Sequence, residues 1–272
     1  MIRPDWRLDR YDTSGKIDLS TNICHDIYLP EWNLTFDKYH NESKLYTILS
    51  DHYQIDMSNI CIGLGLSELV VRLFTVLKER NYTLNIKGKP TWAYMSALQE
   101  VFKIPHGNDV VYFANPNGNT GAYVSEPPRG DILTILDLAY SDFCSESVSV
   151  IPSDDTIIMK TLSKSLGLPG CRFGWLFGGT TLINRLQELR PAVISVGNMS
   201  EYLEDMLLHI TPHVKRMNDT KRVLQVKYNC KPSEGNYVLF SDNSDITELE
   251  NKFKMKRVNN MTRMSLINSE LI

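Results

Sequence analysis

Residues 161–174 bring together side chains that can bind a phosphorylated aldehyde. Lys164 carries an amine that can form a Schiff base with a carbonyl, and two hydroxyl side chains, Thr161 and Ser163, precede it. Arg172 follows eight residues later (172 − 164 = 8), and its guanidinium can bind a phosphate through two parallel hydrogen bonds. Glycines at positions 167, 170 and 174 and a proline at 169 predict a tight, non-helical path. This path lets the lysine and the arginine converge on one ligand, whereas a basic surface loop would explain only the charge.

A carboxylate precedes this segment at the end of a predicted strand. Residues 132–138 form an apolar run of the length of a buried strand, and Asp137 lies near its end. Open α/β sheets bind ligands at the carboxyl ends of their strands. There Asp137 could pair with the pyridine nitrogen of pyridoxal phosphate (PLP) and keep it protonated, so that the ring accepts electrons, and Tyr140 could donate to the phenolic oxygen of the ring. Its position 27 residues before Lys164 (164 − 137 = 27), with another apolar strand between them, favours this role over that of a capping residue.

These two segments resemble the class I/II aminotransferases of PLP fold type I, and most of all the histidinol-phosphate aminotransferase branch. The similar stretches are residues 137–140 and 163–174. The resemblance implies that Lys164 carries the cofactor, that Asp137 meets the pyridine nitrogen, that Tyr140 meets the phenolic oxygen and that Arg172 binds the phosphate. It extends from about residue 18 to about residue 266 and is dense only in 110–175.

Further motifs of the same family follow in the family's order. Residues 63–68 resemble its glycine-rich turn, which implies that the backbone of Gly65, Leu66 and Ser67 surrounds the phosphate. Apolar spacing over 66–77 independently predicts an amphipathic helix after this turn. A helix that begins at a glycine turn presents free amides and the positive end of its dipole to an anion. On its own, such a turn is in most cases only a connection.

The remaining motifs imply contacts with the ring, the substrate and a second subunit. Three of the residues concerned also have plainer interpretations. Trp92 could be a packed surface aromatic, Arg263 an ordinary strand arginine and Tyr39 a tyrosine beside a helix. Alternation around 263–266 predicts a strand with one face in the core and the other facing the cleft. The residues that the resemblance implies are Trp92, stacked on the ring; Asn117 and Asn119, in the loop beneath it; Arg263 and Asn22, which bind substrate; and Tyr39, which reaches the cofactor phosphate of the other subunit of a homodimer.

The sequence departs from the family pattern at three places. Gly118 stands where most relatives have the asparagine that contacts the phenolic oxygen, so Asn117 or Asn119 must substitute, and we favour Asn117. The segment between Trp92 and the asparagine-rich loop is much shorter than in typical relatives. The chain of 272 residues is also short for the family, which predicts a small substrate lobe. None of these differences affects Lys164, Asp137 or Arg172.

Composition is that of a soluble enzyme with one sizeable core. Hydrophobic residues make up 42% of the chain and charged residues 22%, and the net charge of −3 gives no electrostatic signal for nucleic acid or a membrane surface. The sequence has no apolar segment of membrane-spanning length and no N-terminal apolar stretch typical of export, which predicts a cytoplasmic protein. Five cysteines without a Cys-x-x-Cys pair, and six scattered histidines, indicate neither a disulfide framework nor a metal site.

The order of predicted elements indicates two domains. Strands near 82–86, 109–114, 132–138, 156–162 and 173–178, with helices near 42–54, 66–80 and 93–101, predict an α/β domain with a mostly parallel central sheet. Helices at 182–190, 199–210 and 213–227 then lead to a strand at 236–240, a helix at 246–253 and strands at 255–258 and 263–267. We therefore predict a large PLP-binding domain over 1–180 and a small α+β domain over 181–272.

The resemblance implies transfer of an amino group to a keto acid from an amino acid or from a phosphorylated, histidinol-phosphate-like amine. Two alternatives stay open. The same scaffold supports amino-acid decarboxylation of the threonine-phosphate decarboxylase type, because the bond that breaks depends on substrate orientation. The other alternative is a truncated, non-catalytic PLP-fold protein that only binds a partner. Gly118 and the short segment favour it, whereas the intact Lys164, Asp137 and Arg172 oppose it.

Overall fold

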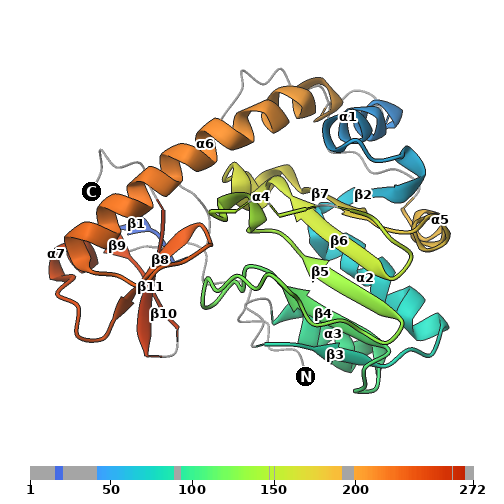
Figure 1. Ribbon diagram of the computed structural model, residues 1–272, viewed down its shortest axis with the longest axis horizontal. Coiled ribbons are helices and arrows are strands. Elements are labelled where there is room, and N and C mark those ends of the chain that lie inside the picture. Colours follow the sequence, from blue (N-terminus) through green and yellow to red (C-terminus); the bar gives the residue numbers. More distant parts are fainter. Residues whose placement is uncertain are drawn as a thin grey trace.

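The computed structural model describes residues 16–20, 42–88, 93–146, 148–149, 151–191, 199–258 and 260–266. Asn22, Tyr39 and Trp92 lie outside these ranges, so their predicted roles stay predictions. A six-stranded sheet forms the largest layer (Figure 1). Its order is β2 (Ile60–Leu64), β7 (Phe173–Phe177), β6 (Thr156–Thr161), β5 (Leu133–Asp137), β4 (Val110–Ala114) and β3 (Leu84–Ile86).

This sheet is mostly parallel, as the sequence predicts. Strands β3 to β6 pair in parallel, and β7 runs antiparallel to both β6 and β2. The strands are buried on both faces, which is why they read as continuous apolar runs. As a result, β5 and β6 end beside each other and bring the segments that follow them together.

Helices cover both faces of the sheet. One core joins the sheet to α2 (Gly65–Glu79), α3 (Tyr94–Phe102) and α5 (Thr180–Glu188). A second core joins the opposite face to α1 (Ser43–Tyr53) and to the first half of α6 (Met199–Tyr228). Short helical segments complete this part, namely η2 (Met57–Asn59), η3 (Ser141–Phe143), α4 (Leu162–Ser165) and η4 (Pro169–Cys171). Within the described ranges, no helix has the length and apolar character needed to span a membrane.

Helix α6 corrects one sequence prediction. Sequence analysis predicted two helices, 199–210 and 213–227, separated at residues 211–212. Instead one helix continues through Pro212. Its two halves are held by different cores, since Leu203 packs with the second core and Met217 with a third. Figure 1 shows α6 arching from α1 to the smaller sheet.

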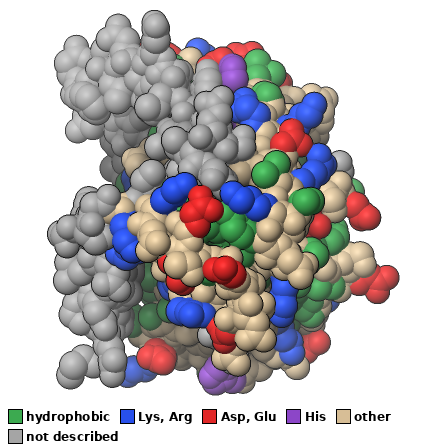
Figure 2. Space-filling model, turned by 90° about the vertical axis from the view of Figure 1, so that its left-hand side faces the viewer, with side chains coloured by type: hydrophobic (Ala, Val, Ile, Leu, Met, Phe, Trp, Pro, Cys, Tyr) green, Lys and Arg blue, Asp and Glu red, His purple; other side chains and the backbone are tan. Residues whose placement is uncertain are grey.

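The third core lies beneath that smaller sheet. The order there is β10 (Lys256–Val258), β11 (Met261–Ser265) and β8 (Tyr237–Ser241), all antiparallel, and α7 (Thr247–Lys252) follows β8. Strand β1 (Ile17–Asp18) pairs in parallel with β9 (Phe253–Lys254). On the face shown in Figure 2, acidic and basic side chains are intermixed. The predicted domain boundary at 180/181 stays a prediction, and it falls inside the first turn of α5, which packs against α2 and β2.

Candidate active site

The predicted phosphate site forms where β2 meets α2. Gly65 begins α2 with a φ of +70°, and a Cβ atom at this position would lie 2.7 Å from Nη2 of Arg172. Arg172 donates to the Pro169 carbonyl at 3.1 Å and lies 3.5 Å from the Ser67 hydroxyl. The positive φ favours glycine at this position, and a side chain here would displace the guanidinium from the first turn of the helix. The structure thus brings the glycine turn and the arginine together, although 107 residues separate them in the sequence (172 − 65 = 107).

A second glycine allows the strand after Arg172 to pass close to this turn. A Cβ atom on Gly174 would lie 3.0 Å from the backbone nitrogen of Leu66. Strand β7 therefore packs directly against the amino end of α2, where backbone N–H groups and the helix dipole attract an anion. Gly65 at the start of α2 and Gly174 on β7 together allow the helix and the strand to lie this close.

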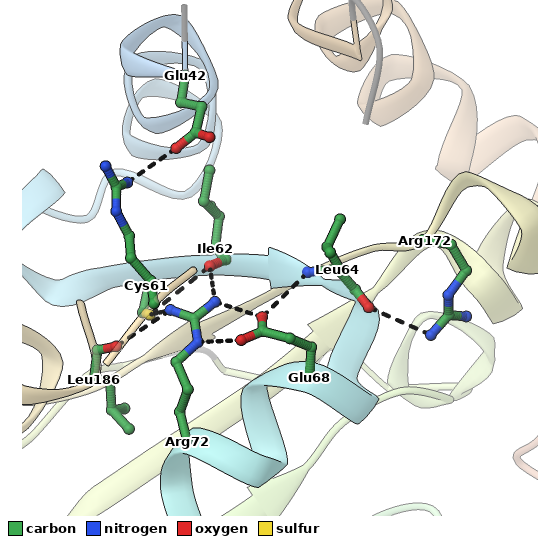
Figure 3. Close-up of polar contacts among 9 residues, drawn as sticks. Glu42, Cys61, Ile62, Leu64, Glu68, Arg72, Arg172 and Leu186 are labelled. Atoms are coloured by element: carbon green, nitrogen blue, oxygen red, sulfur yellow. Dashed lines mark hydrogen bonds and ion pairs between the residues drawn. The ribbon is translucent and has the colours of Figure 1, made fainter. Parts of the chain in front are cut away.

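A buried ion pair fixes the orientation of the turn. Arg72 on α2 pairs with Glu68 one turn earlier and donates to the carbonyls of Ile62 at 3.0 Å and Leu186 at 3.2 Å (Figure 3). Glu68 accepts from the Leu64 backbone nitrogen at 3.3 Å, immediately before the turn. The side chain of Arg72 is only 3% exposed. This pair ties the first turns of α2 to β2 and α5, and sequence analysis did not identify it.

We expect Arg72→Met to lower the free energy of unfolding by about 3–5 kcal/mol, because the change leaves the partly buried carboxylate of Glu68 and the carbonyls of Ile62 and Leu186 without the guanidinium that donates to them. The matched control is Arg222→Met, which removes an exposed pair with Asp219 and should cost at most about 1 kcal/mol. Urea denaturation of both variants measures the difference. Equal losses would show that the buried pair contributes no more than a surface pair.

The lysine segment follows β6. Thr161 caps the amino end of α4, where its hydroxyl accepts from the Ser163 backbone nitrogen at 3.2 Å and donates to the Phe173 carbonyl at 2.9 Å. The Ser163 hydroxyl lies 3.0 Å from the Thr161 hydroxyl. Nζ of Lys164 lies 5.6 Å from the centre of the Tyr140 ring. The cap therefore sets the direction of Lys164, while a phosphate contact of Thr161 or Ser163 stays a prediction.

A buried polar cluster joins the lysine segment to the segment that carries Tyr140. Lys160 is 5% exposed, pairs with Asp142 at 2.5 Å and donates to the Ser141 hydroxyl at 3.0 Å. Ser165, the residue after Lys164, also donates to Asp142. These contacts fix α4, which carries Lys164, relative to η3, which follows Tyr140. Sequence analysis missed this cluster, because nothing local marks Lys160 as the partner of Asp142.

Asp137 lies at the carboxyl end of β5 and is buried. Its Oδ2 accepts from the Tyr112 hydroxyl at 2.6 Å, and its Oδ1 accepts from the Ala139 backbone nitrogen at 3.0 Å. Burial holds the pKa of Asp137 above its usual value, and the two hydrogen bonds and the charge of Lys164 offset part of that rise. The carboxylate is therefore held rigidly next to a cation. Tyr112 was not among the predicted site residues.

The asparagine-rich loop follows β4. The side-chain oxygen of Asn117 accepts from the backbone nitrogens of Asn119 at 2.9 Å and Thr120 at 3.1 Å, so it shapes the loop. Its amide nitrogen stays close to Gly88, where a Cβ atom would lie 3.2 Å away. The side-chain oxygen of Asn117 is thus occupied by two backbone donors, and among the described residues none accepts a hydrogen bond from its amide nitrogen. The contact of Asn117, or else of Asn119, with the phenolic oxygen in place of Gly118 stays a prediction.

Arg263 on β11 reaches this loop from the smaller sheet. It is 3% exposed and donates to the carbonyls of Gly118 at 3.3 Å and Ser20 at 3.2 Å, and among the described residues its buried Nε has no hydrogen-bond partner. Burial lowers its pKa. Its guanidinium lies 5.4 Å from the ring centre of Tyr237, a residue that sequence analysis missed.

Tyr237 connects the two sheets at this point. Its hydroxyl donates to the Asn117 carbonyl at 2.9 Å, and its ring meets Tyr140 edge to face at 6.2 Å. Lys164, Tyr140, Tyr237 and Arg263 therefore form a continuous row across the junction. A primary amine stands at one end of this row and a buried guanidinium at the other.

A family model for aminotransferases of class I and II matches residues 64–256 of this chain, which include the glycine turn, Asp137, Lys164 and Arg172. The chain belongs to the class I and II aminotransferases. Enzymes of this family use PLP as their cofactor. The described residues fit that group, because Arg172 and Ser67 gather hydrogen-bond donors for a phosphate at the glycine turn, and Asp137 is a buried carboxyl group on which the charge of Lys164 acts.

Curated and solved members of the family agree with this assignment. The histidinol-phosphate aminotransferase of Clostridium novyi is 26% identical over 227 residues, which cover 71% of this chain and 63% of that relative. An aminotransferase structure from Burkholderia pseudomallei superposes with a TM-score of 0.75 at 18% identity and covers 96% of both chains. The histidinol-phosphate aminotransferase of Sinorhizobium meliloti, solved in complex with PLP, has a TM-score of 0.67 at 17% identity and covers 86% of this chain and 80% of its own. The likeness confirms PLP fold type I.

Proposed function

We propose that this chain is a PLP-dependent aminotransferase that moves an amino group between an amino acid and a keto acid. One observation carries the proposal. Segments far apart in the sequence place Lys164, Asp137 and the Gly65–Arg172 contact around the junction of β5, β6 and α2. If Lys164 were only structural, or Asp137 only a residue at a strand end, there would be no reason for the lysine, the carboxyl group and the glycine–arginine contact to lie together.

The proposed roles follow from chemistry and position. PLP, when bound, supplies an aldehyde for the amino group and an electron-accepting ring. Lys164 holds the cofactor covalently and then moves the proton at Cα of the substrate, while Asp137 binds the ring nitrogen. Arg172, Ser67 and the backbone of Gly65 and Leu66 bind the phosphate. The remaining proposed contacts with the cofactor are those of Trp92, Asn117, Asn119, Tyr140, Thr161 and Ser163.

A covalent-labelling experiment tests this function. The purified protein is incubated with PLP, reduced with borohydride, digested and analysed by mass spectrometry. We expect one pyridoxyl group on the peptide that contains Lys164. Labels spread over surface lysines, with none preferred, would favour the non-catalytic alternative. Amino donors are then screened for two products, because release of a keto acid identifies amino transfer and release of carbon dioxide identifies decarboxylation.

We propose that Arg263, together with Asn22, reads the substrate carboxylate. The buried Nε of Arg263 and its position at the end of the row from Lys164 support this role. Arg263→Ala should weaken amino-acid binding by roughly ten- to a hundredfold, the equivalent of about 1.5–3 kcal/mol for a charge-assisted hydrogen bond. Arg257→Ala, an exposed arginine on the neighbouring strand, is the control. A large loss of PLP affinity with intact amino-acid binding would contradict the assignment.

The substrate, the assembly and the location are finer proposals that rest on the resemblance. A histidinol-phosphate-like amine is the first donor to test, since the similar Clostridium novyi protein is a histidinol-phosphate aminotransferase. We also propose a cytoplasmic homodimer in which Tyr39 reaches the neighbouring cofactor. Light scattering of the purified protein measures the assembly, and a monomeric mass at full activity would remove Tyr39 from the site.

A further inference from the structure

The hydroxyl of Tyr112 reaches Asp137 from the middle of the neighbouring strand. Tyr112 is 1% exposed, and its hydroxyl lies 2.6 Å from Oδ2 of Asp137. The other oxygen accepts from the Ala139 backbone nitrogen. Both oxygens are thus held in place by donors inside the protein. A phenylalanine at position 112 would keep the packing of the ring and would lose only the hydrogen bond to Asp137.

Strand register explains how this contact arises. In the parallel pairing of β4 and β5, Ala114 lies opposite Asp137, and Tyr112 lies opposite Ile135. Residues two apart on a strand point to the same face, so Tyr112, Ala114 and Asp137 share one face of the sheet. Because Ala114 is small, the space beside Asp137 is open to the long side chain of Tyr112. The contact is therefore built into the sheet and does not depend on a loop.

The surroundings of Asp137 make this donor chemically significant. Ile135, Met159 and Ala114 belong to the apolar core on this face, and burial in such surroundings favours the neutral acid. Donation by Tyr112 favours the carboxylate. Burial also raises the pKa of Tyr112 well above its usual value, so its hydroxyl keeps its proton and stays a donor. Lys164 and Tyr140 are the other ionisable groups that act on this pair.

We propose that Tyr112 is a positioning residue of the active site, which keeps Asp137 ionised and fixes its oxygens for the ring nitrogen of the cofactor. The inference rests on the proposed function. A neutral Asp137 would leave the ring nitrogen without a negative partner, and the ring would then accept electrons less well. Tyr112 acts through Asp137 and needs no contact with the substrate.

The test compares Tyr112→Phe with Tyr46→Phe, which removes a hydroxyl from a partly buried tyrosine of α1 that packs on the second core. In cofactor-free protein with ¹³C-labelled aspartate, carboxyl resonances are followed against pH, and Asp137→Asn identifies the Asp137 signal. We expect Asp137 to titrate at higher pH in Tyr112→Phe and to be unchanged in the control. In the PLP-loaded protein, kcat should fall about tenfold to a hundredfold, as for the loss of a hydrogen bond to a charged group, with KM little changed.

The outcomes separate this inference from the proposed function. Absence of the label on Lys164 in the wild-type protein overturns both. A labelled Lys164 together with identical Asp137 titrations in wild type and Tyr112→Phe overturns the inference alone. Site-specific incorporation of a fluorinated tyrosine at position 112 provides a second measurement, which decides even if Tyr112→Phe does not fold. This stronger donor should move the Asp137 titration to lower pH, and no movement would also overturn the inference.

Discussion

Lys164→Ala is expected to abolish covalent attachment of PLP and to reduce amino transfer by about two to four orders of magnitude, the contribution of a positioned acid–base group. The amine of Lys164 is both the attachment point and the base in the proposed mechanism, so no neighbour can replace it. The phosphate contacts near Arg172 remain, and weak binding of PLP should persist. Borohydride reduction followed by mass spectrometry, together with a keto-acid assay, measures the two effects.

Lys164→Arg is the matched control for this change. It keeps a positive charge in the same place but cannot form the covalent link, because a guanidinium stays protonated. Both variants should therefore lose labelling, and the arginine variant should retain tighter packing against Tyr140. A label that persists at full strength in Lys164→Ala would show that the cofactor lysine lies elsewhere.

Asp137→Asn is expected to lower turnover by orders of magnitude while the covalent link at Lys164 still forms. Replacing the carboxylate by an amide removes the charge that keeps the ring nitrogen protonated, and leaves the shape of the site almost unchanged. Asp109→Asn is the control, since Asp109 precedes β4 at the opposite end of the sheet and accepts hydrogen bonds from Thr83. Near-normal turnover in Asp137→Asn would make the strand-end carboxylate structural.

Most of the sheet and the sequence motifs of the site could be predicted from short windows. Apolar runs identified β4, β5, β6 and β7 to within two residues at either end, because strands buried on both faces carry that pattern through their whole length. The Gly65 turn and the Lys164 segment were recognisable because glycines, hydroxyls and charges stand within a few residues of one another. Strand β2 was missed, since its apolar run is interrupted by Gly63 and followed directly by the turn.

Contacts that depend on pairing between distant segments could not be predicted. Tyr112 reads as an ordinary strand aromatic until the register of β4 against β5 places it beside Asp137. Lys160 likewise reads as a polar residue in a strand, and only the fold brings it to Asp142. The predicted break in α6 at residues 211–212 was wrong, because packing of both halves of that helix outweighs the local cost of Pro212.

The pairing of β1 with β9 has a consequence for the order in which the protein folds. Residues 17 and 253 are paired neighbours, and the carbonyl of Ser20 accepts from Arg263, 243 positions later. Closing so long a loop is slow compared with forming local helices, and during synthesis it must wait until the later partner has left the ribosome. The central sheet can assemble earlier, since its strands end at Phe177. The junction around Arg263 therefore forms after the central sheet on a nascent chain, so a ribosome stalled between the two would present the proposed cofactor-binding part without the proposed carboxylate site.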